Sequence, residues 1–67
     1  MSTQEYITGY IQENGPSKAS EMSLATREIA NYRIVEAIPF MLKMGRLKVE
    51  QSECGIEVYD LPEVSSE

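Results

Sequence analysis

The chain has 67 residues, which suffice for one domain with one modest hydrophobic core. A chain this short rarely builds both a stable core and a buried catalytic pocket, so its length argues against an enzyme. The formal net charge is −5 at pH 7. That charge excludes a protein that coats nucleic acid through a uniformly basic surface.

The sequence contains no histidine and a single cysteine, Cys54, so it offers neither an internal disulfide nor a zinc cluster. The polar residues 1–5 do not form a secretory signal pattern. The longest unbroken apolar run, residues 37–42, is too short to cross a bilayer. We therefore expect a cytoplasmic protein with no membrane span, no metal and no cofactor, and an exposed thiol at Cys54.

The first predicted helix covers residues 3–13. Ser2 and Glu5 have the spacing of a capping box, in which a serine and a glutamate satisfy free amides at a helix start. Four apolar residues then recur at helical spacing, namely Tyr6, Ile7, Tyr10 and Ile11. Residues 14–16, Asn-Gly-Pro, end the pattern.

A second, shorter helix is expected after residues 17–20, which offer candidate caps. Its apolar groups would be Met22, Leu24, Ala25 and Ile29. The end of this helix stays open, because residues 26–30 are compatible with an extension, a turn or a join to the next helix.

The third predicted helix begins with Asn31 as its N-cap and runs to about residue 44. One face is apolar and comprises Ile34, Ile38, Met41 and Leu42. Gly45 is the expected stop. Pro39 lies inside this helix and removes a backbone hydrogen bond, so we expect either a kink or a helix that starts later.

After Gly45 the apolar period changes from that of a helix to that of a strand. Residues 46–50 and 56–61 alternate around a turn at residues 52–55, and Pro62 ends the second run. This pattern predicts a β-hairpin whose apolar face packs on the helices. The expected fold is α+β, mainly α: a winged helix-turn-helix domain over residues 1–61 with a flexible tail over 62–67.

Aromatic and sulfur side chains divide into core and surface groups. Tyr6, Tyr10 and Tyr59 are expected in the core, and Tyr32 is expected to be exposed. Met22 and Met41 are expected to fill the core.

Several short motifs resemble those of the small bacterial and phage winged helix-turn-helix regulators, in particular the short regulators of fimbrial adhesin operons. The resemblance covers about residues 5–61. It is carried by residues 14–16 (Asn-Gly-Pro), 18–22 (Lys-Ala-Ser-Glu-Met), 31–32 (Asn-Tyr), 42–47 (Leu-Lys-Met-Gly-Arg-Leu) and 58–61 (Val-Tyr-Asp-Leu).

The resemblance implies DNA binding, with the third helix in the major groove and the hairpin against the backbone. The implied groove-facing residues are Tyr32, Arg33 and Glu36, with Phe40 at the edge. The implied phosphate contacts are Ser17, Lys18, Ser20, Lys43, Arg46 and Lys48. Arg33 is the best base-reading candidate, because arginine pairs bidentately with guanine. The alternative for Arg33 is a surface ion pair with Glu28 or Glu36.

Two functional hypotheses remain open. The first is a transcriptional regulator that binds double-stranded DNA as a homodimer or with a protein partner, since one copy has few cations. All six cations lie within residues 17–48, and the C-terminal part is acidic. The second hypothesis uses that acidity: a winged-helix interaction module, such as an adaptor or antirepressor, that does not bind DNA.

Overall fold

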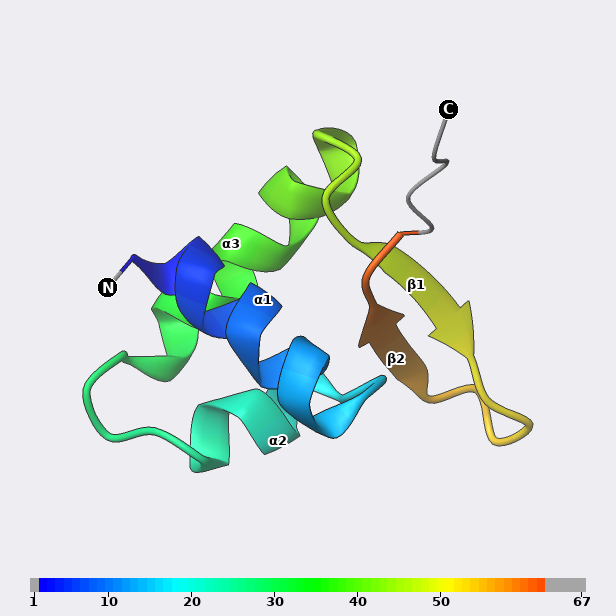
Figure 1. Ribbon diagram of the computed structural model, residues 1–67. Coiled ribbons are helices and arrows are strands. Elements are labelled where there is room, and N and C mark those ends of the chain that lie inside the picture. Colours follow the sequence, from blue (N-terminus) through cyan, green and yellow to red (C-terminus); the bar gives the residue numbers. More distant parts are fainter. Residues whose placement is uncertain (1, 63–67) are drawn as a thin grey trace.

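The computed structural model describes residues 2–62 and shows a small, mainly helical α+β fold (Figure 1). Three helices precede a two-stranded antiparallel hairpin, as the sequence pattern predicts. In chain order the elements are α1 (Thr3–Asn14), α2 (Ala19–Leu24), α3 (Asn31–Lys43), β1 (Lys48–Gln51) and β2 (Glu57–Asp60). The predicted tail covers residues 62–67, and all of it except Pro62 lies outside the described residues.

Helix α1 begins with the predicted capping box. The amide of Glu5 donates to the Ser2 hydroxyl at 3.2 Å, and the amide of Ser2 donates to Glu5 Oε1 at 3.1 Å. Ile7 and Ile11 are buried, and the helix ends before Gly15, whose φ of 81° favours glycine. The prediction for this helix is confirmed within one residue.

Helix α2 has six residues, and its end resolves the question left open by the sequence. The stretch 25–30 is a non-helical connection in which the Glu28 amide donates to Thr26 Oγ1. Met22 is buried as predicted. Leu24, another of the apolar groups expected on this helix, is 86% exposed. It lies two residues after Met22, so the two side chains lie on opposite sides of the helix.

Helix α3 starts one residue earlier than predicted. Ala30, not Asn31, is the N-cap, and its carbonyl accepts hydrogen bonds from Arg33 and Ile34. The helix continues through Pro39, so the alternative of a late start is wrong. Pro39 is exposed, and Val35, whose carbonyl loses its helical donor to the proline, is also exposed. Solvent can therefore hydrate that carbonyl, which reduces the cost of the proline.

The hairpin pairs β1 with β2 in antiparallel register, with Val49 opposite Tyr59 and Glu50 opposite Val58. Its turn closes with a bond from the Gly55 amide to the Ser52 carbonyl at 2.8 Å. Gly55 has a φ of 79°, as expected in a three-residue hairpin loop. Strand β2 is one residue shorter at each end than the predicted run, whereas β1 starts two residues later and ends one residue later than predicted.

A single residue from the connection between α1 and α2 extends the sheet. Ser17 forms an antiparallel bridge with Tyr59, in which each amide donates to the other's carbonyl at 2.9 and 2.8 Å. Figure 1 shows β2 between β1 and the helices, so this bridge attaches the hairpin to the helical layer.

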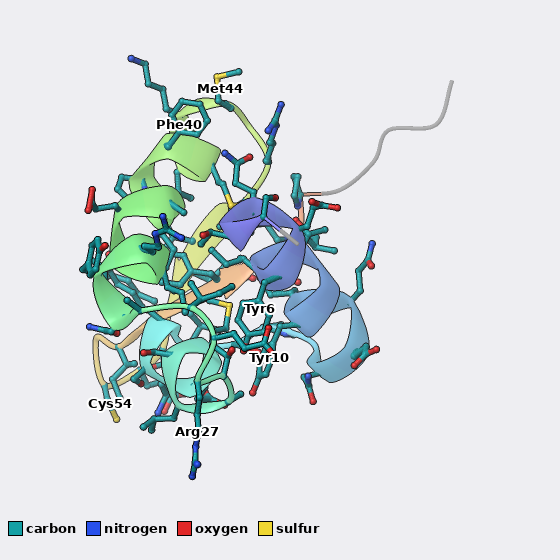
Figure 2. All side chains as sticks on the ribbon, turned by 90° about the vertical axis from the view of Figure 1, so that its left-hand side faces the viewer. Tyr6, Tyr10, Arg27, Phe40, Met44 and Cys54 are labelled. Atoms are coloured by element: carbon teal, nitrogen blue, oxygen red, sulfur yellow. The ribbon has the colours of Figure 1, made fainter. Side chains whose placement is uncertain are left out.

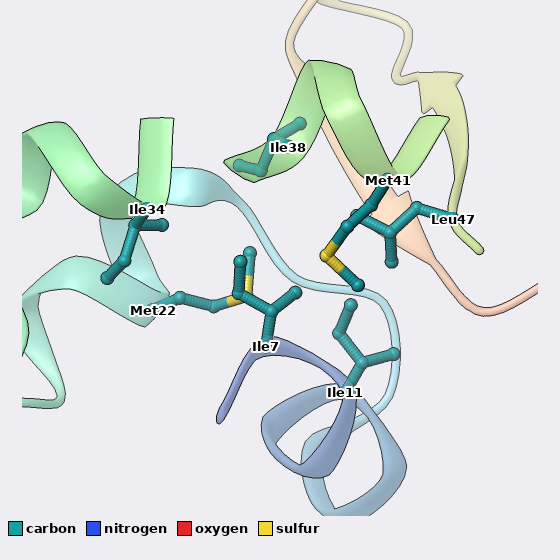
Figure 3. Packing of buried hydrophobic residues seen from close by; sticks show 7 residues of the cluster. All are labelled: Ile7, Ile11, Met22, Ile34, Ile38, Met41 and Leu47. Carbon is teal, nitrogen blue, oxygen red and sulfur yellow. The ribbon is translucent and has the colours of Figure 1, made fainter. Parts of the chain in front are cut away.

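The core consists of seven buried apolar side chains drawn from all three helices and the start of the hairpin (Figure 3). They are Ile7, Ile11, Met22, Ile34, Ile38, Met41 and Leu47. Burial of each contributes roughly 1.5–3 kcal/mol to stability before entropy is subtracted. Tyr6, Tyr10 and Tyr59 pack against this cluster. In residues 2–62 no helix has both the length and the apolar character that a bilayer crossing requires.

Candidate nucleic-acid interface

The outward face of α3 is the surface to which the predicted groove-facing residues belong. Ile34, Ile38 and Met41 point into the core. With 3.6 residues per turn, Tyr32, Glu36 and Lys43 fall on the opposite side. Tyr32 is 62% exposed, so its predicted exposure is confirmed. These three residues therefore share a face that the rest of the fold leaves uncovered.

Arg33 lies on the flank of this face, toward α1. It lines a surface groove of about 890 Å³ between the start of α1, the connection 25–30 and α3. Tyr32, Glu36 and Phe40 line the same groove, so the structure brings the predicted set together. Phe40 is 49% exposed.

No carboxylate in the described part of the chain forms an ion pair with a cation of α3. Within residues 2–62 the one ion pair joins Lys48 to Glu50. The alternative pairing of Arg33 with Glu28 or Glu36 is therefore not formed, although both glutamates line its groove. The positive charge of Arg33 stays available to a ligand.

Three of the predicted phosphate contacts are exposed at helix ends. Lys18 precedes the first residue of α2, and Ser20 lies in its first turn. Lys43 is the last residue of α3, where it also faces the negative end of the helix dipole. All three are accessible to a phosphate oxygen.

Ser17 is a correction to the predicted set. It is 2% exposed, and its hydroxyl donates to the Gly15 carbonyl at 2.9 Å. Its amide and carbonyl are both bonded to Tyr59. A residue with all its polar groups buried and satisfied cannot contact phosphate.

Arg46 and Lys48 are exposed or half-exposed, but both already have partners. Arg46 Nη1 donates to Gln4 Oε1 at 2.6 Å, which places the guanidinium against α1. It lines a second surface groove with residues of that helix. Lys48 Nζ lies 4.0 Å from Glu50 Oε1 on the same strand. These two cations are therefore not gathered on the outward face of α3.

The hairpin loop is acidic and exposed. Glu53 and Cys54 form its tip, and Glu50 and Glu57 lie exposed on the strands below it. The thiol of Cys54 is free and exposed, as predicted. A loop of this charge is repelled by phosphate, so any nucleic-acid contact depends on the helices.

Apolar exposure on α3 is the feature that sequence reasoning underestimated. Val35, Phe40 and Met44 are each about half exposed. Figure 2 shows Phe40 and Met44 projecting from the same end of α3. Their positions around the helix could have predicted this exposure from the sequence, because all three fall outside the stripe of Ile34, Ile38 and Met41.

Comparisons with known proteins do not assign the chain to a family. No family model matches it, and neither a curated protein nor a solved structure matches it. The functional assignment therefore depends on the residues and geometry described above.

Proposed function

We propose that the chain is a winged helix-turn-helix regulator that binds double-stranded DNA, with the outward face of α3 in the major groove. The order of the elements supports this fold: α2 and α3 form the helix-turn-helix pair, and the hairpin follows as the wing. The Ser17–Tyr59 bridge adds support, because it holds the hairpin beside the helices.

The observation that carries the proposal is the cationic side chain of Arg33, which is exposed on α3 and has no ion pair among residues 2–62. The major groove of DNA admits an α-helix, and a guanidinium can donate two hydrogen bonds to the edge of guanine. The exposed side chains of Tyr32 and Glu36 flank Arg33 within one turn. Glu36 can accept from the amino group of cytosine.

Backbone contacts come from Lys18, Ser20 and Lys43 in this proposal. They replace the longer predicted set, because Ser17 is buried and Arg46 is bonded to Gln4. Few phosphate contacts per copy give weak binding, since each contact adds to affinity and to its salt dependence. Two copies or a protein partner would therefore be needed on a natural site.

The test is retention of a pool of random duplex DNA by the folded protein, measured as salt is raised, with sequencing of the retained fraction. We expect retention at low salt that falls steeply with salt concentration, together with enrichment of a short motif. If the protein retains no DNA even at low salt, where contacts to the DNA backbone are strongest, the proposal is wrong.

A second candidate function is protein binding through the same helix. The specific observation in its favour is the pair of half-exposed apolar side chains Phe40 and Met44, which project from the same end of α3 (Figure 2). Apolar side chains concentrated on one exposed surface mark protein interaction sites. Replacing Phe40 and Met44 with serine would abolish partner binding in this reading, whereas DNA retention would depend on Arg33.

A further inference from the structure

Strand β1 has one edge that no other strand covers. The sheet contains β1 and β2, and the one-residue bridge from Ser17 is formed on the far side of β2. Figure 1 shows β1 at the outside of the molecule, with β2 between it and the helices. The outer backbone groups of β1 therefore have no strand partner among residues 2–62.

The hydrogen bonds of the hairpin identify which residues of β1 direct their backbone amides and carbonyls away from β2. The Ser52 amide donates to the Ile56 carbonyl, so that pair is hydrogen-bonded within the hairpin. Hydrogen-bonded pairs alternate along an antiparallel ladder, so Glu50 and Lys48 also direct their backbone groups toward β2. Val49 and Gln51 then direct their amides and carbonyls outward.

The Ser17–Tyr59 bridge confirms this alternation independently. Tyr59 stands opposite Val49 in the register and directs its amide and carbonyl away from β1, to Ser17. Its partner across the ladder must likewise direct its groups away from β2. The outward edge of β1 thus presents two donors and two acceptors, on Val49 and Gln51.

We propose that a second copy of this chain pairs with this edge, so that two β1 strands run antiparallel across a two-fold axis at Val49. Val49 then faces Val49 of the second copy as a hydrogen-bonded pair. Gln51 faces Leu47 in the same way. The two hairpins become one four-stranded sheet, and the exposed side chain of Val49 is partly covered.

Charge selects this register over its neighbours. With Val49 on the axis, Lys48 stands opposite Glu50 of the second copy, and Glu50 stands opposite its Lys48. Both are non-hydrogen-bonded pairs, in which side chains approach most closely. Oppositely charged pairs at such positions stabilise a sheet.

Shifting one strand by two residues in either direction removes this complementarity. A shift toward the loop sets Glu50 against Glu50, and the opposite shift sets Lys48 against Lys48. Like charges directly opposite each other destabilise pairing. A lysine on an edge strand normally prevents association. Here the alternation Lys-Val-Glu disfavours both neighbouring registers relative to the register with Val49 on the axis.

The inference is independent of the proposed DNA binding, although the same dimer would bring two α3 helices into one particle. The contact is small, so the dimer is expected to form only at high protein concentration. Its strength should depend on salt, because the selecting pairs are ionic.

The experiment is sedimentation equilibrium of the whole chain across a concentration series, with two single variants. Glu50→Lys sets lysine against Lys48 of the second copy, and Lys48→Glu sets glutamate against its Glu50. Each variant alone should dimerise roughly tenfold more weakly than the natural chain. Lys48 also faces Asp60 within the hairpin, whereas Glu50 faces Val58, so Glu50→Lys is the cleaner variant.

The deciding measurement mixes the two variants in equal amounts. In the mixed dimer every charge again faces its opposite, so association should return to the natural strength. Arg27→Glu changes the net charge as Lys48→Glu does, but in the exposed connection between α2 and α3, away from β1 (Figure 2), and should leave association unchanged. A natural chain that stays monomeric at millimolar concentration, or a mixture no stronger than its components, would overturn the proposal.

Discussion

The phenolic hydroxyl of Tyr6 donates a 2.7 Å hydrogen bond to the main-chain carbonyl of Met22. This bond joins α1 to α2 at a point where α2 needs a partner. Met22 lies in the last turn of a six-residue helix, and carbonyls there have no donor within the helix. An aromatic side chain of α1 thus completes the end of α2 while packing on the core.

Replacing Tyr6 with phenylalanine should lower the free energy of unfolding by about 1 kcal/mol, because the Met22 carbonyl loses its donor. The matched control is Tyr10→Phe, since Tyr10 also packs on the core but its hydroxyl has no bond among residues 2–62. Urea denaturation of both variants measures the difference. Equal effects from the two substitutions would show that the hydroxyl of Tyr6 is not a structural link.

The phenol of Tyr6 also gives a prediction at high pH. Burial is the main cause that raises the pKa of Tyr6 above 10.0, and nearby Tyr10 adds to it. The folded state therefore prefers the neutral phenol. Its contribution to stability is complete below the unfolded pKa and is lost as pH rises through the folded value. Tyr6→Phe should remove this part of the alkaline loss of stability, which thermal melts above pH 9 will detect.

Glu5 predicts the opposite trend at low pH. Hydrogen bonds from the Ser2 amide, and then from the Ser2 hydroxyl, lower the pKa of Glu5 below 4.5. A lowered carboxylate pKa gives stability that is present above the unfolded value and is lost as pH falls through the folded one. Melting curves from pH 7 to pH 3 should therefore drop less for Glu5→Gln than for the natural chain. Parallel curves would contradict the capping box.

Two glycines give a matched pair of stability predictions. A Cβ at Gly55 or at Gly9 would meet no atom within 4 Å, so backbone conformation alone decides the outcome. Gly55→Ala should cost about 1 kcal/mol, because its φ of 79° is unfavourable for alanine. Gly9→Ala, inside α1, should stabilise by roughly 0.5–1 kcal/mol. Chemical denaturation that gives the same sign for both would contradict the described turn.

Arg33 tests the proposed base contact. Arg33→Ala should weaken binding to a selected DNA site by about 1–3 kcal/mol and leave the melting temperature nearly unchanged, since the side chain is exposed. Arg33→Lys keeps the charge but cannot form the bidentate pair. It should lose sequence preference while keeping most of the salt-dependent binding. Fluorescence anisotropy with selected and scrambled duplexes separates these effects.

The helices were largely predictable because their signals are local. Ser2 and Glu5 lie three residues apart, and Ile7 and Ile11 lie one turn apart, so short patterns suffice to place α1. The hairpin turn around Gly55 is local as well. The site is less predictable, because exposure depends on what the rest of the chain covers.

Contacts between distant residues account for the errors. Ser17 has the composition of a surface cap, and its burial depends on Tyr59, which a pattern around residue 17 does not contain. Arg46 is a predicted phosphate contact, but its guanidinium is hydrogen-bonded to Gln4, which is distant in the sequence. Leu24 has an apolar side chain, but it follows the buried Met22 by two residues, which places it on the opposite side of α2 from the core.

The Ser17–Tyr59 bridge has a consequence for how the molecule opens. Its two hydrogen bonds close a loop of about 40 residues that contains α2, α3 and β1, so the entropy cost of closing that loop is offset only while those elements hold its ends together. A two-stranded hairpin alone is marginal in water. Exchange of the Tyr59 amide with deuterium should therefore be as slow as exchange in the core helices. That single proton reports whether the hairpin and the helices unfold as one cooperative unit.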